Sequence, residues 1–306
     1  MNLRFAASRV GAVCAAAALA VSVPALGASG SPSPNLSLSP TYLAAGASTA
    51  SFLQSSGSTQ EKTTVTTVES GKSNDLGGPY FLRSADPEGL GVIALKLKYE
   101  YVKEHKDEDH ELEGILEWGM AENWEFILEV PVELGDGKVE GNGDIAEFGF
   151  HTRLWEESEM MPAFAVRNLV RLPTGYHSDG VDYTLIGLFT KTLTSDGLRC
   201  HFNPFLKSIN GNQEEGDRDF RWGAALGMDY KLSDEVRVIA DYIHQNSEEE
   251  GNRNQHSVEL GLDWEFAPEQ TISVATEFEL DGDNSGDDFS ARVQYMIDVP
   301  GPIIGG

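Results

Sequence analysis

Much of the chain alternates between apolar and polar residues with a period of two. The clearest example is the stretch 143–175, which reads as two arms joined by a short polar turn. On the first arm Phe148 and Phe150 point away from His151, and the second arm keeps the alternation except for the polar residue Asn168 on its apolar side. An apolar face opposite a charged face is typical of an outer-membrane strand pair, although a hairpin of a soluble sandwich alternates in the same way.

Twelve segments with this alternation follow one another along the chain. They cover residues 93–101, 111–120, 124–133, 146–154, 164–172, 181–193, 198–208, 220–230, 236–245, 258–266, 272–280 and 289–297. The connections alternate between short turns, such as 121–123 and 194–197, and longer loops, such as 211–218 and 247–254. Bacterial single-chain barrels have an even number of strands, short periplasmic turns and longer outer loops. The pattern therefore predicts an all-β fold, a transmembrane antiparallel β-barrel of about 12 strands whose termini lie in the periplasm.

Aromatic residues on the apolar faces gather at two heights. Trp118, Trp124 and Trp264 lie beside short turns, whereas Tyr99 and Trp222 lie towards the long loops. Aromatic rings prefer the headgroup level of a bilayer, so membrane barrels carry them in two girdles. A soluble sandwich has no reason to place them in this way, and the barrel is the favoured interpretation.

The N-terminal part of the chain has the features of an exported protein. Residues 1–27 contain two arginines, then an uncharged apolar run, then small residues at the expected cleavage site, and we interpret them as a signal peptide. Residues 28–89 are rich in Ser, Thr and Gly, and we interpret them as a flexible, disordered periplasmic segment that ends in a Gly- and Pro-rich approach to the barrel. The barrel is expected over 90–298 and a C-terminal tail over 299–306. This organisation predicts export to the outer membrane of a Gram-negative-type bacterium.

Composition and charge narrow the classes of function. The 306 residues carry a formal net charge of −27, which argues against nucleic-acid binding because that activity needs a basic surface. Cys14 lies in the leader and leaves Cys200 alone, so the mature chain has no internal disulfide. The acidic loop 105–110 lacks the ligand spacing of a known metal site. We therefore expect neither a cofactor nor a metal ion.

The stretch 143–175 also resembles a known family. Gly143-Asp144-Ile145 opens a strand, Arg153-Leu154 lies near its end, and the next strand finishes in Leu172-Pro173-Thr174-Gly175. These motifs are similar to those of the outer-membrane barrel family named for the MetA pathway of phenol degradation, whose members are described as outer-membrane transporters. The strand ladder extends the likeness to about residues 90–298. The resemblance implies a barrel and, more loosely, an aromatic or other hydrophobic solute.

The polar faces of the strands are heavily charged, and the two signs lie mostly on different strands. The residues that we expect to line the lumen and contact a solute are Arg153, Arg167, Arg171, Arg199, Lys207, Arg221, Glu117, Glu129, Glu259, Asp263 and Glu277. Either the charges pair across a narrow lumen and leave little open pore, or they line a wet channel as opposed basic and acidic walls. Guanidinium groups bind anions and stack on aromatic rings, which favours the arginines as solute contacts.

Three functions follow from this pattern. The main prediction is a channel for passive uptake of small solutes, with outer-membrane lipid, the solute and the barrel-insertion machinery as partners. The alternative is a structural or interaction barrel whose lumen is plugged by charges. A third is an outer-membrane hydrolase, which needs a serine and a histidine on the lipid-facing rim. His244, His256 and Ser247 lie close in sequence, but no acid is spaced to complete a triad, and we predict no catalytic residue.

Overall fold

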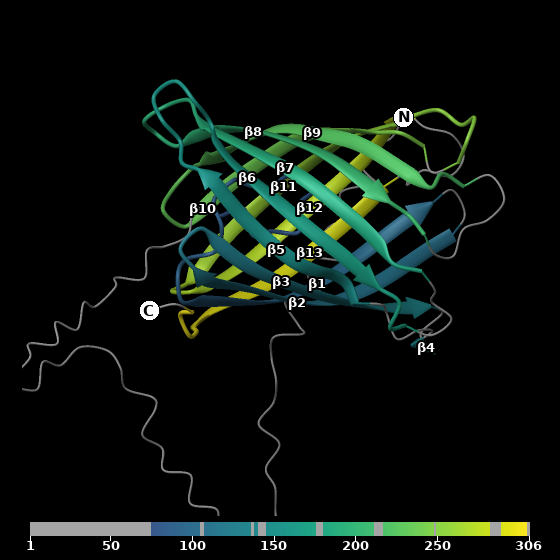
Figure 1. Ribbon diagram of the computed structural model, residues 1–306, viewed down its shortest axis with the longest axis horizontal. Coiled ribbons are helices and arrows are strands. Elements are labelled where there is room, and N and C mark those ends of the chain that lie inside the picture. Colours follow the sequence, from purple (N-terminus) through teal and green to yellow (C-terminus); the bar gives the residue numbers. More distant parts are fainter. Residues whose placement is uncertain are drawn as a thin grey trace, which may run out of the picture. The chain divides into compact units, whose positions relative to one another are not determined.

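The computed structural model describes residues 75–104, 107–135, 138–139, 145–175, 180–210, 217–247, 249–281 and 289–304. This part of the chain is built from strands (Figure 1). They are β1 (Val92–Glu104), β2 (Asp107–Ala121), β3 (Trp124–Gly135), β4 (Lys138–Val139), β5 (Ile145–Trp155), β6 (Ala163–Leu172), β7 (Asp182–Thr192), β8 (Leu198–Ser208), β9 (Phe220–Lys231), β10 (Val236–Gln245), β11 (Gln255–Ala267), β12 (Gln270–Asp281) and β13 (Phe289–Pro300). Within these ranges there is no helix long and apolar enough to cross a membrane.

The strands close into one antiparallel barrel. The two-residue strand β4 pairs with β3 beside the ring, and each of the other twelve strands pairs with the preceding and following strand. Pairing of β1 with β13 closes the ring, in a register that runs from Val92 opposite Pro300 to Lys103 opposite Phe289. The structure thus confirms the predicted all-β antiparallel barrel of 12 strands.

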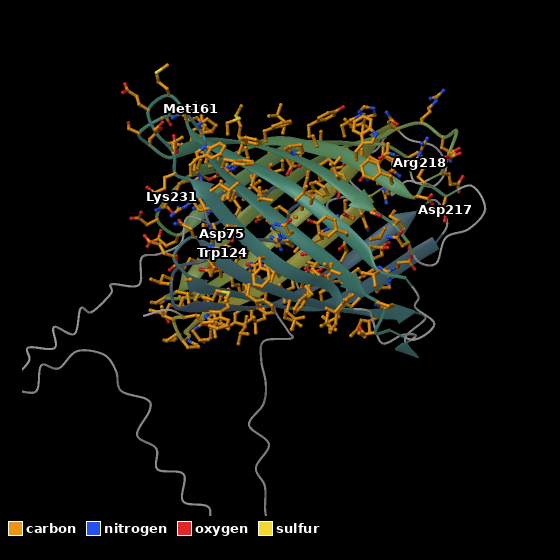
Figure 2. The ribbon with its side chains drawn as sticks, viewed as in Figure 1. Asp75, Trp124, Met161, Asp217, Arg218 and Lys231 are labelled. Carbon is orange, nitrogen blue, oxygen red and sulfur yellow. The ribbon has the colours of Figure 1, made fainter. Side chains whose placement is uncertain are left out.

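Most large apolar side chains of the wall point outward, and most charged side chains of the wall point inward (Figure 2). Leu97 on β1 and Leu226 on β9 are 52% and 54% exposed, whereas Glu117 on β2 and Glu259 on β11 are 2% and 0% exposed. Successive residues of a strand point to opposite faces, which produces the alternation seen in the sequence. A water-soluble fold buries its large apolar residues, so this inversion fits an outer surface that meets lipid.

The one polar residue on the outer face of the 143–175 hairpin has a partner on the next strand. The Oδ1 atom of Asn168 on β6 accepts a hydrogen bond of 2.7 Å from the hydroxyl group of Tyr183 on β7. A polar group that faces hydrocarbon is costly without such a bond. The indoles of Trp124, Trp222 and Trp264 are also exposed on the outer surface, as expected for interfacial girdles.

The residues just before β1 lie inside the barrel. We call residues 75–91 the lumen segment; they form no strand, yet Leu76, Leu82 and Ala85 are fully buried and Tyr80 is 3% exposed. For residues 75–89 this differs from the flexible periplasmic segment expected from the sequence, because the lumen gives their apolar side chains a surface that no sequence period reveals. The rest of that expected segment and the leader lie outside the described residues.

Candidate functional site: the barrel lumen

Hydrogen bonds from the wall hold the lumen segment along its length. Most of them join a wall side chain to a backbone group of the segment. They link Gln294 to the Gly77 carbonyl (2.6 Å), Glu259 to the Phe81 N–H (3.3 Å), Asn203 to the Arg83 carbonyl (3.0 Å), Thr190 to the Ala85 N–H (2.7 Å) and Glu125 to the Glu88 N–H (2.7 Å). These wall residues belong to β13, β11, β8, β7 and β3, so the segment is tied to strands around the ring. Apart from backbone hydrogen bonds of Gly91 at its end, to Gly119 (2.7 Å) and from Gly301 (2.7 Å), these contacts are separate side-chain bonds and not a ladder of backbone hydrogen bonds.

One side of the lumen is apolar and receives the ring of Tyr80. Tyr80 and Leu82 pack in a buried cluster whose wall members are Ala225, Ile239, Ile243 and Ala275. The Tyr80 hydroxyl group donates a hydrogen bond of 2.5 Å to Asp263 Oδ1, which also accepts one of 2.6 Å from Ser273. Gly261 provides the space for the ring, because a Cβ atom there would lie 2.1 Å from Tyr80 Cε1. The wall therefore accommodates an aromatic ring that carries a hydroxyl group.

Filling the space at Gly261 is expected to displace the lumen segment. In a Gly261→Val variant the new side chain would overlap the Tyr80 ring and break its bond to Asp263. A protease is too large to enter the lumen, so trypsin should cut after Arg83 in the variant and not in the wild-type protein, as read by mass spectrometry. Gly114→Val on β2 is the matched control, because a Cβ atom there meets nothing within 4 Å. Equal protection of Arg83 in both variants would contradict this role of Gly261.

Arg292 is the centre of the charge network on β1, β11, β12 and β13. Its guanidinium group donates hydrogen bonds to Glu100 (2.7 Å), Glu259 (2.6 Å) and Glu277 (2.7 Å), each on a different strand. The sequence analysis predicted the two glutamates of β11 and β12 but gave Arg292 no role. Its place on the inner face followed from the alternation, whereas its three partners depend on the register between strands.

A second network links β1, β2, β5 and β6. Arg167 lies 3.0 Å from Glu147 and 3.6 Å from Glu117, and Lys96 pairs with the same Glu117. Arg167 and Glu117 are 3% and 2% exposed. This pairing neutralises charges that would otherwise be very costly to bury.

A third network connects the wall to the lumen segment. Asp229 on β9 accepts a hydrogen bond of 2.9 Å from Arg199 and lies 2.6 Å from His201 Nε2, both on β8. The other ring nitrogen of His201 is 3.0 Å from the hydroxyl group of Thr190, which accepts the Ala85 N–H. The buried His201 thus connects the Arg199–Asp229 ion pair, through Thr190, to the backbone of the lumen segment. The sequence analysis did not single out this residue.

The predicted lumen residues lie on the polar faces of their strands, but they do not form opposed basic and acidic walls. Arg171 pairs with Asp182 on the neighbouring strand (2.7 Å), and Arg153 pairs with Asp86 of the lumen segment (3.2 Å). Glu129 on β3 stands opposite Glu147 on β5 in the sheet register. The arrangement favours the interpretation in which charges pair within the lumen. Contact of these residues with a solute stays a prediction.

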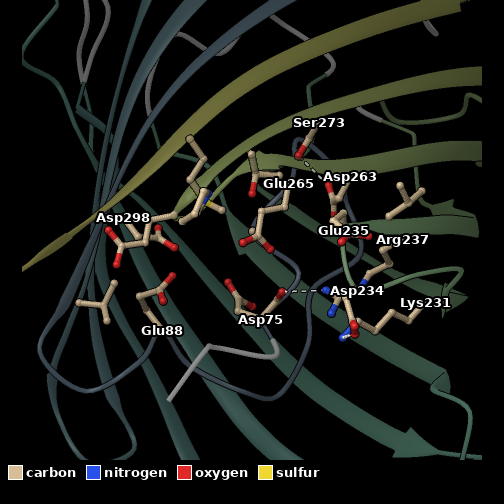
Figure 3. Close-up of a pocket in the computed structure, with 18 of the residues that line it drawn as sticks. Asp75, Glu88, Lys231, Asp234, Glu235, Arg237, Asp263, Glu265, Ser273 and Asp298 are labelled. Carbon is tan, nitrogen blue, oxygen red and sulfur yellow. Dashed lines mark hydrogen bonds and ion pairs between the residues drawn. The ribbon is translucent and has the colours of Figure 1, made fainter. Parts of the chain in front are cut away.

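A cavity of about 590 Å³ lies at the short-turn end of the barrel, beside the beginning of the lumen segment (Figure 3). The charged residues of its lining are mainly acidic and include Asp263, Glu265 and Asp298, together with the cations Lys231 and Arg237. Figure 3 shows these side chains reaching into the cavity from the turns and strand ends around it. The cavity forms a vestibule in front of the lumen segment.

Three carboxylates meet beside this vestibule. Oxygen atoms of Asp75, Glu88 and Glu117 lie within 4.8 Å of one another, and such oxygen ligands are those that Ca²⁺ and Mg²⁺ prefer. Burial, together with the neighbouring carboxylates of Glu125 and Glu117, raises the pKa of Asp75 from 3.8 to about 6. Between pH 3.8 and about 6, Asp75 in this buried position therefore holds a proton that an exposed Asp75 would lose. The raised pKa of Asp75 stabilises its buried position below pH 3.8, and this stabilisation is lost as the pH rises through about 6.

The candidate residues of a hydrolase have other contacts. Ser247 is 1% exposed, and its hydroxyl oxygen accepts the N–H of Glu249 (3.3 Å). The Nδ1 atoms of His244 and His256 lie 3.4 Å from each other. The serine is thus buried and bonded to the backbone, away from the position that a nucleophile on the rim would need.

No protein-family model and no curated protein matches the sequence. Among solved structures, the fold is similar to that of an outer membrane channel from Pseudomonas putida F1, with a TM-score of 0.52, 11% sequence identity and coverage of 69% of this chain and 96% of that chain. The NanC porin aligns with a TM-score of 0.49 and 11% identity over 66% of this chain and 98% of that one. The CymD monoaromatic hydrocarbon channel aligns with a TM-score of 0.40 and 8% sequence identity over 68% of this chain and 88% of that chain. At these identities the likeness to the Pseudomonas channel shows the barrel fold.

Proposed function

We propose that the protein is an outer-membrane channel that passively admits small solutes when the lumen segment moves aside. The observation that carries this proposal is the way in which the lumen is filled. Separate side-chain bonds hold the segment, whereas backbone ladders hold the wall. Each such bond contributes only about 0.5–1.5 kcal/mol net, so the segment can leave while the barrel stays closed. In the same proposal residues 1–27 are a signal peptide, and the chain is a member of the phenol-degradation MetA-type family.

The site of Tyr80 supports an aromatic solute. Its ring lies on an apolar part of the wall and its hydroxyl group meets Asp263. On the same segment, the ring of Phe81 packs 5.4 Å from that of Phe205 on β8. A small aromatic molecule with a polar substituent would find both a hydrophobic surface and a hydrogen-bond acceptor when these side chains withdraw.

Swelling of liposomes that contain the purified protein tests the proposal. Uncharged aromatic alcohols are expected to enter faster than sugar alcohols of equal size, because the former can occupy the Tyr80 site. Liposomes with a heat-denatured sample are the control for leakage through lipid. Swelling that is equal with and without folded protein, for every solute, would contradict transport.

The alternative is a structural barrel, and the lumen segment is the observation that favours it. Leu76 and Leu82 of the segment are fully buried, as expected for a permanent part of the interior. A structural barrel would pass no steady current in a planar bilayer at any voltage, whereas a channel with a removable segment would open in discrete steps.

Two cations near the long-loop end are expected to set ion preference. Lys207 on β8 and Arg221 on β9 stand directly opposite each other, and Arg171 lies at the same end of β6. A double change, Lys207→Gln with Arg221→Gln, should therefore shift the ion preference towards cations, measured as reversal potential in a salt gradient. Lys231→Gln at the other end is the control. An unchanged reversal potential in the double variant would show that Lys207 and Arg221 do not lie along the route of the ions.

A further inference from the structure

Two histidines on the outer face meet at the base of a long loop. His244 near the end of β10 stands directly opposite His256 near the start of β11 in the antiparallel register. Their ring centroids are 4.6 Å apart and their Nδ1 atoms are 3.4 Å apart. Both side chains are partly exposed on the apolar side of the wall. They belong to neither the lumen nor the vestibule.

Tyr242 brings a third polar atom to the same point. Its hydroxyl group contacts His256 Nδ1, the atom that also faces His244. A neutral imidazole nitrogen carries either a proton or one lone pair, so His256 Nδ1 cannot accept from both neighbours at full strength. Two such nitrogens face each other favourably only when a proton or a cation lies between them.

We propose that Tyr242, His244 and His256 bind a divalent transition-metal ion such as Ni²⁺, Cu²⁺ or Zn²⁺. Imidazole nitrogen is a preferred ligand of these ions, whereas Ca²⁺ and Mg²⁺ prefer oxygen. Two nitrogens bound at about 2.1 Å to one tetrahedral ion lie about 3.4 Å apart, which equals the separation of the two Nδ1 atoms here. The two imidazoles therefore need little movement to receive the ion, whereas the Tyr242 hydroxyl group, now in direct contact with His256 Nδ1, would move away from that atom to become the third ligand.

A bound ion would fix the base of the loop that joins β10 to β11. This loop begins and ends within two residues of the two histidines and reaches the neighbouring loop, where Glu249 forms a bridge with Asp217. The Glu249 carbonyl also accepts a hydrogen bond of 3.2 Å from Arg218, a residue at the long-loop end in Figure 2. Metal binding would thus hold two adjacent loops in one arrangement.

Titration of the untagged full-length protein in detergent micelles with Ni²⁺ tests the site. Isothermal calorimetry is expected to show saturable binding of one ion per chain. Cu²⁺ should also quench part of the tryptophan fluorescence, because the Trp222 ring lies 5.5 Å from that of His244. His244→Gln and His256→Gln, each alone, should weaken binding by more than about tenfold, since each removes a ligand.

His110→Gln is the matched control. His110 is also a histidine beside a tyrosine, with its Nδ1 atom 2.7 Å from the Tyr99 hydroxyl group, and this variant should bind Ni²⁺ as the wild-type protein does. Absence of saturable binding to the folded wild-type protein would overturn the proposal and leave a shared proton between the histidines. Equal weakening by His110→Gln and His244→Gln would overturn it as well. Neither readout depends on transport, so the proposed function can fail while this site stands.

Discussion

Removal of residues 28–88 is expected to raise the single-channel conductance of the barrel several-fold. The lumen segment places Leu76, Tyr80 and Leu82 in the interior, where these buried side chains take up space that an emptied lumen would leave free. Ionic current through a narrow pore grows with its free cross-section, so an emptied lumen should conduct far better than a filled one. Planar bilayers in symmetric salt give the measurement directly.

A shorter truncation distinguishes the effect of the lumen segment from that of the residues that precede it. Removing residues 28–74 alone leaves the lumen segment in place and should keep the conductance of the full chain. The ring closes between Val92 and Pro300, so both truncated proteins keep the twelve strands of the ring, and heat-modifiable migration on a gel verifies that they fold. Equal conductance of both truncated forms and the full chain would show that residues 75–88 do not occupy the conducting path.

The strands could be predicted from the sequence because lipid and water impose a strict alternation on them. Leu226 faces hydrocarbon and its neighbour Gly227 faces the lumen, and most of the other strands alternate in the same way. The constraint depends only on local sequence, since successive side chains of a strand always point to opposite faces. Twelve such segments joined by alternating short and long connections leave a closed ring as the simplest arrangement.

The lumen segment could not be predicted in this way. Its apolar residues, Leu76, Tyr80 and Leu82, follow neither the strand nor the helix period, and the glycines and prolines around them are typical of a surface linker. What buries them is a concave wall made by Ala225, Ile239 and other residues far along the chain. The unusual feature in the sequence is four large apolar or aromatic residues, Leu76, Tyr80, Phe81 and Leu82, within seven positions of a stretch otherwise suited to a linker.

The partners of the charged residues could not be predicted from the sequence either. The alternation placed Arg171 and Arg199 inside the barrel, but it gave no distance between them and any carboxylate. Their partners, Asp182 and Asp229, lie on the neighbouring strands and depend on the register of each pair of strands. The sequence placed positive and negative residues mostly on different strands, and this overstated the distance between opposite charges. An ion pair needs only one opposite charge within reach on a neighbouring strand.

Replacement of Arg292 by alanine is expected to destabilise the barrel by about 3–5 kcal/mol, the usual cost of leaving a buried charge without its partner. Arg292 is the shared partner of Glu100, Glu259 and Glu277, and Glu259 is fully buried. Without the guanidinium group these carboxylates repel one another across the strands that close the ring. Denaturant unfolding in lipid vesicles, followed by tryptophan fluorescence, measures the change.

Two further variants test whether the loss of stability comes from the buried pairing of one guanidinium group with three carboxylates. Arg292→Lys keeps the positive charge but loses the planar fork that meets three carboxylates at once, so its stability should lie between those of alanine and arginine. Lys231→Ala removes a cation whose partner Asp234 is 92% exposed, and water screens that pair. A stability loss in Arg292→Ala no larger than in Lys231→Ala would mean that water in the lumen, and not Arg292, neutralises the three carboxylates.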